Sequence, residues 1–170
     1  ERRRGLYGEN LRDSMIAMVH AVTDRAVDAR IGDDQLPEEW DMNAFSESIS
    51  AIIPIGRINI KEDALAQMTK EKLKDSMKNL GEQLYQLKEK EIGQGQPDGE
   101  ERMRELERVV MLRVIDQKWM DHIDDMDQMR QGIGLHAYAQ RDPLMEYKFT
   151  AYDMFEEMSQ HIQEDTLKIL

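Results

Sequence analysis

Residues 100–131 read EERMRELERVVMLRVIDQKWMDHIDDMDQMRQ and contain neither glycine nor proline. Apolar residues recur along this stretch in steps of three and four, which predicts one long α-helix of about 48 Å at about 1.5 Å per residue. Residues 109–112 and 114–115 are apolar nearly all round, so we expect this part of the helix to be buried on more than one side. The expected core stripe comprises Met103, Leu106, Val109, Leu112, Ile115, Trp119, Ile123, Met126 and Met129.

The long helix is expected to end at Gly132 and Gly134, with a loop from there to Asp142. Asp142 is a favourable N-cap and Pro143 suits a first helical turn, so a second long helix should begin there. Two long helices joined by a loop of about ten residues pair antiparallel. The apolar stripe expected on the second helix comprises Leu144, Tyr147, Ala151, Phe155, Met158, Ile162 and Ile169.

The region before this hairpin also predicts helices. The first is capped by Asn10 and ended by Gly32, the second follows Pro37, and the third spans about residues 61–92. Residues 53–60 alternate only weakly, which favours an extended connector over a short edge strand. The apolar positions of the three helices are Leu11, Met15, Met18, Val22, Ala26 and Ala29; Trp40, Phe45, Ile49 and Ile52; and Leu73, Met77, Leu80, Leu84 and Leu87.

A linker divides the chain into two expected units. Residues 93–99 read GQGQPDG, a combination of glycine and proline that is typical of a linker. We therefore expect an all-α fold in which a small helical module over residues 8–93 precedes a helical hairpin over residues 100–170. Residues 1–7 are expected to be the tail of a preceding helix. The chain also begins and ends within helical patterns, which indicates a piece of a larger protein.

The composition excludes several classes of protein. A formal net charge of −12 argues against a nucleic-acid binder that relies on neutralising phosphates. The absence of cysteine excludes disulfide scaffolds, thiolate metal sites and cysteine nucleophiles. No apolar run approaches the roughly 20 residues of a membrane-spanning helix, and no signal peptide is recognisable, so a soluble acidic protein is expected.

Candidate catalytic or cofactor sites are weak. No phosphate-binding loop sequence is present, and the glycines of residues 93–99 have the wrong spacing and follow a helix instead of a strand. Asp121 and Asp125 share a helix face beside His122 and could hold a hard cation, but a solvated acidic face explains them better. No cofactor or metal is therefore expected for this chain.

The stretch between the two hairpin helices is unusual. Over residues 132–141 the sequence has one formal charge, that of Arg141. Ile133 lies between Gly132 and Gly134, and the residues that follow include Leu135, His136 and Tyr138. An apolar tip suggests contact with a partner, although a loop folded back on the hairpin would explain it equally well. Met120 and Met145 lie off the expected core stripes and are further candidates for a partner surface.

Three consecutive runs of the sequence resemble one known family. They are LRVIDQKWMDHI at residues 112–123, MDQMRQGIGL at residues 126–135, and YAQRDP at residues 138–143 followed by EYK at residues 146–148. They are similar to part of the SecA family of preprotein translocase ATPases, and weaker similarity extends upstream over practically the whole chain. The resemblance implies that residues 8–93 are a helical wing domain, residues 94–99 a linker and residues 100–170 the two-helix finger of the helical scaffold.

The resemblance also implies functional roles. Tyr138, with Ile133, Leu135, His136 and Met145, would contact the preprotein at the SecY channel. Trp119, Asp116 and Arg130 would pack on the ATPase domains and restrain hydrolysis, while Gly132 and Gly134 would act as a hinge. The alternative is a purely regulatory or structural module that packs on the motor domains without touching the preprotein.

Further implications concern the larger protein. ATP and Mg would be bound by other domains, so this chain alone would not be an enzyme. The implied partners are the SecYEG channel, an unfolded preprotein, the ATPase domains, a second copy and an anionic phospholipid surface, but not nucleic acid. The implied location is the cytoplasm and the cytoplasmic face of the bacterial cell membrane.

Overall fold

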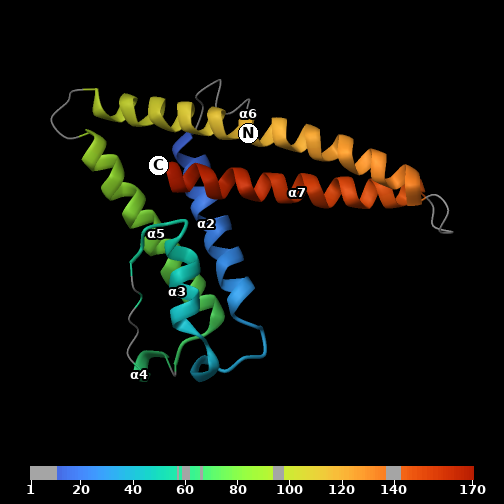
Figure 1. Ribbon diagram of the computed structural model, residues 1–170. Coiled ribbons are helices and arrows are strands. Elements are labelled where there is room, and N and C mark those ends of the chain that lie inside the picture. Colours follow the sequence, from blue (N-terminus) through green and yellow to red (C-terminus); the bar gives the residue numbers. More distant parts are fainter. Residues whose placement is uncertain (1–10, 57, 59–61, 66, 94–97, 137–142) are drawn as a thin grey trace.

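The computed structural model describes residues 11–56, 58, 62–65, 67–93, 98–136 and 143–170. Within these residues the chain is helical and contains no strand, which confirms the all-α prediction. The elements in chain order are α2 (Leu11–Arg30), η1 (Pro37–Glu39), α3 (Met42–Ser50), α4 (Glu62–Leu65), α5 (Lys70–Gly93), α6 (Gly99–His136) and α7 (Pro143–Ile169). Figure 1 shows α6 and α7 side by side, with α2, α3 and α5 gathered at one end of the pair.

Helix α2 is the centre of the fold. It contacts α3, α5, α6 and α7, so it is buried over a wide face and not along a single stripe. The predicted Leu11, Met15, Met18 and Val22 are all buried, whereas Ala29 is exposed. Further buried positions that the predicted stripe did not contain are Ser14, Val19, Thr23 and Val27. The expected cap, Asn10, lies outside the described residues.

The segment after Pro37 is not one helix. Pro37–Glu39 form a single 3₁₀ turn, and α3 begins only at Met42, where Asp41 accepts a hydrogen bond of 2.9 Å from the amide of Ala44. A side-chain oxygen at this position satisfies a helical amide that would otherwise lack a partner, which sets the start of α3. The predicted core positions Trp40, Phe45 and Ile49 are confirmed, because they are buried together with residues of α2 and α5. The fourth, Ile52, is only partly buried.

The predicted helix over residues 61–92 is wrong in its first part. The structure has the short α4, then a turn, and α5 begins at Lys70. Thr69 explains this start, since its hydroxyl oxygen accepts a hydrogen bond of 3.2 Å from the amide of Lys72. Further along, the buried face of α5 continues through Gly81 to Tyr85, and Leu87 is 60% exposed, contrary to the prediction.

Gly81 lies where α5 crosses α2. A Cβ atom at this position would stand 2.6 Å from Cγ1 of Val19, which is well inside van der Waals contact. The absence of a side chain therefore lets the two helices approach closely, and this outweighs the low helix propensity of glycine.

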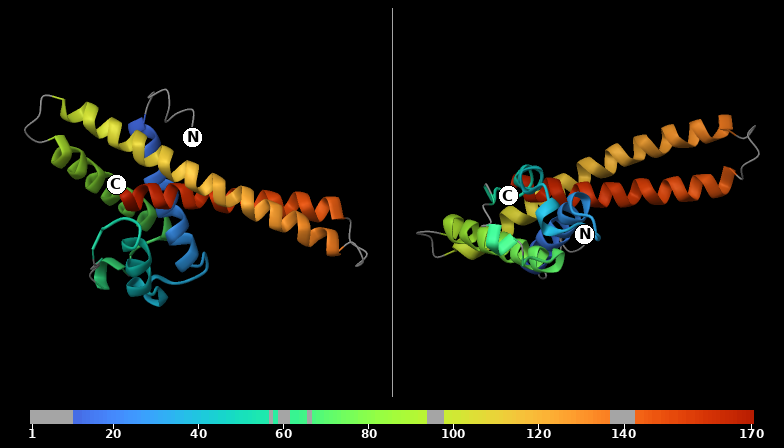
Figure 2. Two further views of the ribbon diagram at one scale, coloured as in Figure 1. Left: turned by 45° about the horizontal axis from the view of Figure 1, so that its top comes forward. Right: turned by 90° about the horizontal axis from the view of Figure 1, so that it is seen from below.

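The hairpin predicted from the sequence is present, but its first helix is longer than expected. Helix α6 is 38 residues long, or about 57 Å, and runs through Gly132 and Gly134 to His136. The expected end of the helix at Gly132 is therefore wrong, and neither glycine breaks the helix. Helix α7 begins at Pro143 as predicted. Figure 2 shows the two helices extending together beyond all the other elements.

The predicted core stripes of the hairpin are only partly correct. On α6 the buried residues are Met103, Glu107, Val110, Met111, Val114 and Ile115, and on α7 they are Met158, Ile162 and Thr166. The predicted core residues Leu106, Val109, Trp119, Ile123, Leu144, Phe155 and Ile169 are instead 38–59% exposed. For those far from the covered end, such as Trp119, Leu144 and Phe155, the reason is geometric, because α2 and α5 cover only one end of the pair and no third described helix lies against the rest. Leu106, Val109 and Ile169 lie at the covered end but on faces of their helices that point away from the core.

One core joins the two parts of the chain on either side of residues 94–97. It includes Met15 and Met18 from α2, Tyr85 from α5, Met111 from α6 and Met158 from α7. Arg25 of α2 adds a hydrogen bond of 2.8 Å from its Nη1 to Oε1 of Gln163 on α7. The end of the hairpin nearest this shared core is called the base below.

Candidate functional site

Of the residues predicted to contact a preprotein, the described ones lie at the end of the hairpin away from the base. Tyr138 is outside the described residues, as are its neighbours over residues 137–142. Ile133, Leu135 and His136 belong to the last turns of α6, but the structure does not describe their side chains. Met145 is described, and its side chain is 45% exposed in the first turns of α7. The expected grouping of these five side chains therefore stays a prediction.

The residues predicted to contact the ATPase domains all lie on α6 but are not brought together. Trp119 is 45% exposed, and Asp116 is exposed one turn before it. Arg130 lies about 16 Å further along the helix, at about 1.5 Å per residue. Its Nη2 contacts Oδ1 of Asp127 at 3.1 Å on an exposed surface. These three residues form no single site within this chain.

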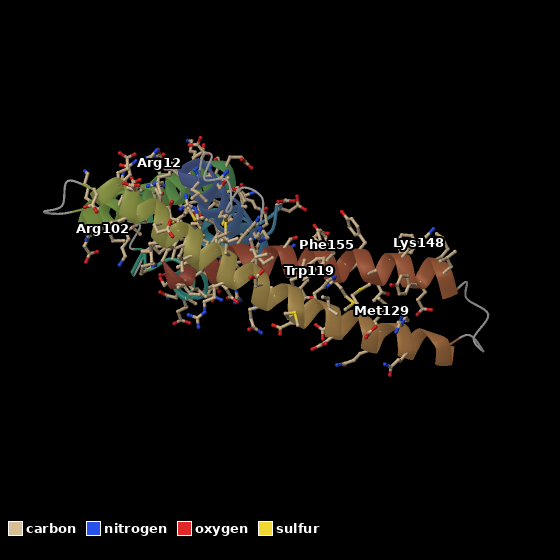
Figure 3. All side chains as sticks on the ribbon, turned by 90° about the horizontal axis from the view of Figure 1, so that it is seen from above. Arg12, Arg102, Trp119, Met129, Lys148 and Phe155 are labelled. Carbon is tan, nitrogen blue, oxygen red and sulfur yellow. The ribbon has the colours of Figure 1, made fainter. Side chains whose placement is uncertain are left out.

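Aromatic rings line one side of the hairpin. The ring centroids of Trp119 and His122 are 5.7 Å apart, and those of His122 and Phe155 are 6.1 Å apart in an edge-to-face arrangement. Figure 3 shows Trp119 on α6 and Phe155 on α7 at the same level of the pair. The row crosses from one helix to the other and is half exposed at both ends, so it is a candidate contact surface.

Other large apolar side chains are exposed on the same half of the hairpin. They include residues of both helices that are 44–66% exposed, namely Met120, Ile123, Leu144, Met145, Phe149 and Tyr152. An antiparallel helix pair can bury only the strip along its contact line, so this exposure is expected for a hairpin without a third helix. So much exposed apolar area is typical of a surface that contacts another protein or another domain.

A polar cavity of about 200 Å³ also lies between α6 and α7. It is lined by Lys118, Asp121, His122 and Asp125 of α6 and by Met154, Glu157, Met158 and His161 of α7. His122 thus belongs both to the lining of the cavity and to the row of aromatic rings. Although the predicted cation ligands Asp121, His122 and Asp125 share this cavity, no group of three or more His, Cys, Asp or Glu residues in the described chain is arranged to hold a metal ion.

An ion pair closes the cavity on its base side. Nζ of Lys118 lies 2.7 Å from Oδ2 of Asp165, and Nζ of Lys168 lies 3.2 Å from Oδ1 of the same carboxylate. Partial burial raises the pKa of Asp165, but the hydrogen bonds from the two lysines outweigh this and hold the pKa below its usual value. Asp165 is therefore ionised at neutral pH, and the pair ties α6 to α7 next to the shared core.

The shared core contains a polar cluster that the sequence analysis missed. Glu107 of α6 is fully buried and accepts hydrogen bonds from the hydroxyl of Tyr85 at 2.5 Å and from Nη1 of Arg104 at 2.8 Å. Arg104 also contacts Glu89, which in turn pairs with Arg12 of α2. The cluster links α2, α5 and α6.

Burial dominates the electrostatics of this cluster. Burial raises the pKa of Glu107, and the hydrogen bond from Tyr85 and the charge of Arg104 offset this only in part. Burial, together with the hydrogen bond to Glu107, likewise raises the pKa of Tyr85. One signal in the sequence could have revealed the cluster. Glu107 lies four residues after Met103 and three before Val110, in phase with the apolar residues.

A membrane-spanning helix would need a long apolar stretch, and no helix in the described part of the chain has one.

Comparison with known proteins identifies related sequences over the full length of the chain. The family model of the SecA Wing and Scaffold domain matches residues 1–170. The protein translocase subunit SecA of Lachnoclostridium phytofermentans is 47% identical over 170 residues, which is 100% of this chain and 19% of that protein. The SecA subunits of Caldicellulosiruptor saccharolyticus and Acetivibrio thermocellus are each 42% identical over 100% of this chain and over 19% and 18% of their own lengths. The chain thus spans about a fifth of the length of these curated relatives.

Proposed function

This chain belongs to the SecA wing and scaffold family, and from that premise we propose that it is the coupling part of an ATP-driven protein translocase. Residues 8–93 form the helical wing, residues 100–170 form the two-helix finger, residues 94–99 link them and residues 1–7 end a preceding scaffold helix. The observation that supports this proposal is the helix pair α6–α7, which is anchored at its base and extends beyond every other element.

The proposed role of the finger is mechanical. Movement of the motor domains shifts the base, and the hairpin carries the shift over much of the length of α6 to a preprotein at the SecY channel. Tyr138 makes the contact, because a tyrosine offers an apolar ring and one polar group to any sequence. Ile133, Leu135, His136 and Met145 surround it, and the exposure of Met145 supports this arrangement.

The middle of the hairpin has a second proposed role, which is to restrain ATP hydrolysis. The exposed Trp119 and Asp116, and further along Arg130, offer an apolar and charged surface to the ATPase domains of the whole protein. ATP and Mg would bind in those domains, so this chain would carry out no catalysis by itself. The other proposed partners are SecYEG, a second copy of the protein and anionic phospholipids at the cytoplasmic face of the membrane.

The test uses the whole translocase with Tyr138→Ala. Translocation of a preprotein into membrane vesicles should be largely lost while ATP binding is retained. Tyr152→Ala is the matched control, because Tyr152 is a 66% exposed tyrosine on the same hairpin. Unchanged translocation by the Tyr138 variant, or equal losses in both variants, would contradict the proposed contact.

The alternative is a purely regulatory module that packs on the motor domains without touching the preprotein. The row of Trp119, His122 and Phe155 favours it, because this half-exposed surface is far from the end of the hairpin. A photo-crosslinker at position 138 separates the two functions. Crosslinks to a stalled preprotein support the mechanical role, whereas crosslinks only to the translocase itself support the regulatory one.

A further inference from the structure

The hairpin changes character partway along its length. Among the described residues, Ile115 is the last buried residue of α6 and Met158 is the first buried residue of α7. Residues 116–132 and 144–157 therefore contain no buried side chain. Because buried apolar contacts hold helices in a fixed relative orientation, the hairpin has a firmly packed base and a loosely packed outer half.

The polar cavity lies at the boundary between the two halves. Its walls carry His122 and His161 as well as Asp121, Asp125 and Glu157, whereas the layer below it is filled by Val114, Ile115, Met158 and Ile162. The space and the polar groups at this level suit water molecules better than tightly packed apolar side chains. The contact line of the hairpin is thus interrupted at this level.

The contacts on either side of the cavity differ in strength. On its base side, the pair of Lys118 and Asp165 and the shared core hold α6 and α7 together. Beyond the cavity, the described side chains of both helices are exposed or only partly buried, and His122 and Phe155 form one edge-to-face ring contact between α6 and α7. Both helices are continuous through this level, so movement here would be a bend and not a break.

We propose that the hairpin bends at the level of His122 and His161, with its base fixed to α2 and α5 and its outer half able to swing sideways. This flexing point is distinct from the predicted hinge at Gly132 and Gly134, which lie within α6 near its far end. The device would let the end of the hairpin move while the base stays attached to the rest of the chain. It does not depend on the proposed function, because it can be measured on the 170-residue chain alone.

The absence of native cysteine allows paired spin labels to be placed without background. One pair, at Gln86 and Gln128, spans the cavity, and a second pair, at Gln86 and Arg113, stays within the base; all three positions are exposed. Pulsed electron spin resonance should give a broader distance distribution for the spanning pair than for the base pair. Equal widths for the two pairs would overturn the proposal.

A variant that closes the cavity provides the second test. His122→Leu/His161→Leu replaces both rings with apolar side chains, so it should narrow the spanning distribution. It should also slow amide hydrogen exchange in residues 116–132 and 144–157 about tenfold, the factor that corresponds to about 1.4 kcal/mol. Gly132→Ala is the control and should leave the spanning width unchanged. If Gly132→Ala narrows the distance distribution of the spanning pair and the double histidine variant does not, the flexing point lies elsewhere and the proposal is overturned.

Discussion

The hydroxyl of Tyr85 on α5 donates a hydrogen bond of 2.5 Å to the buried carboxylate of Glu107 on α6. This contact joins the residues before the linker to those after it, at the point where α2 also packs on the hairpin. A buried carboxylate is costly unless it is hydrogen-bonded, so the pairing fixes where α5 can lie on α6.

Removing the Tyr85 hydroxyl should destabilise the chain. Tyr85→Phe keeps the ring but takes one hydrogen bond from a buried charged group, which should lower the free energy of unfolding by about 1.5–3 kcal/mol. Urea unfolding followed by circular dichroism measures the change. Tyr152→Phe, the same substitution at an exposed tyrosine, should shift stability by less than about 0.5 kcal/mol. Equal effects of the two substitutions would show that the hydrogen bond to Glu107 contributes nothing specific.

The raised pKa of Glu107 predicts how stability depends on pH. The folded chain holds the Glu107 proton to a higher pH than the unfolded chain, whose glutamate has the ordinary pKa of 4.5. The contribution of Glu107 to the free energy of unfolding is therefore fully present below pH 4.5, and it is lost as the pH rises through the pKa of Glu107 in the folded chain.

Glu107→Gln removes the titrating carboxyl group, and its coupled partners Tyr85 and Arg104 titrate only at much higher pH. The free energy of unfolding of the variant minus that of the unaltered chain should increase as the pH rises above 4.5. The subtraction cancels the other titrating groups. A difference that decreases over the same range would mean that Tyr85 and Arg104 outweigh burial and lower the Glu107 pKa.

The sequence was sufficient for the helices and for the hairpin, because helix period and capping residues are local properties. The apolar pattern alone placed two helix starts wrongly, since α3 begins after Asp41 and α5 after Thr69, later than the pattern suggested. Both residues are ordinary N-cap types, so closer attention to capping would have placed both starts correctly.

Burial on the hairpin could not be read from the sequence. Trp119 and Phe155 lie in phase with core positions but are half exposed, because α2 and α5 cover only the base. Glu107 was overlooked for the opposite reason, since a charged residue was not expected within the core. Both errors arise from tertiary packing, which a periodic pattern on one helix does not specify. The roles of Tyr138 and its neighbours stay predictions, because the structure does not describe their side chains.

Gly81 should tolerate no side chain. Gly81→Ala would place Cβ 2.6 Å from Cγ1 of Val19, and valine has no flexible end that could move aside. We expect the crossing of α2 and α5 to open, at a cost of about 1–3 kcal/mol that exceeds the roughly 1 kcal/mol gained in helix propensity.

The matched control for Gly81→Ala is Gly132→Ala. Apart from its chain neighbours and the backbone of its own helix, no described atom lies within 4 Å of a Cβ atom built at Gly132, so this substitution should stabilise the chain by up to about 1 kcal/mol. Thermal unfolding of the two variants should therefore shift in opposite directions. A stabilising effect of Gly81→Ala would show that the close approach to Val19 is not needed for the crossing.

The ion pairs between α2 and α5 should contribute little and should depend on salt. Oδ1 of Asp28 lies 2.8 Å from Nζ of Lys70 and 2.9 Å from Nζ of Lys74, and its side chain is 50% exposed. The hydrogen bond from Lys70, and next that from Lys74, lower the pKa of Asp28 in the folded chain below its ordinary value of 3.8. The stabilisation of the fold by these ion pairs is therefore present above pH 3.8 and is lost as the pH falls through the pKa of Asp28 in the folded chain.

Asp28→Asn should therefore cost at most about 1 kcal/mol at neutral pH and low ionic strength. The loss should nearly vanish at about 1 M salt, where the screening length is about 3 Å. Asp34→Asn, at an exposed aspartate in the segment after α2, controls for the change in net charge. A loss for Asp28→Asn that is unaffected by salt would mean that the side chain acts through packing and not through its charge.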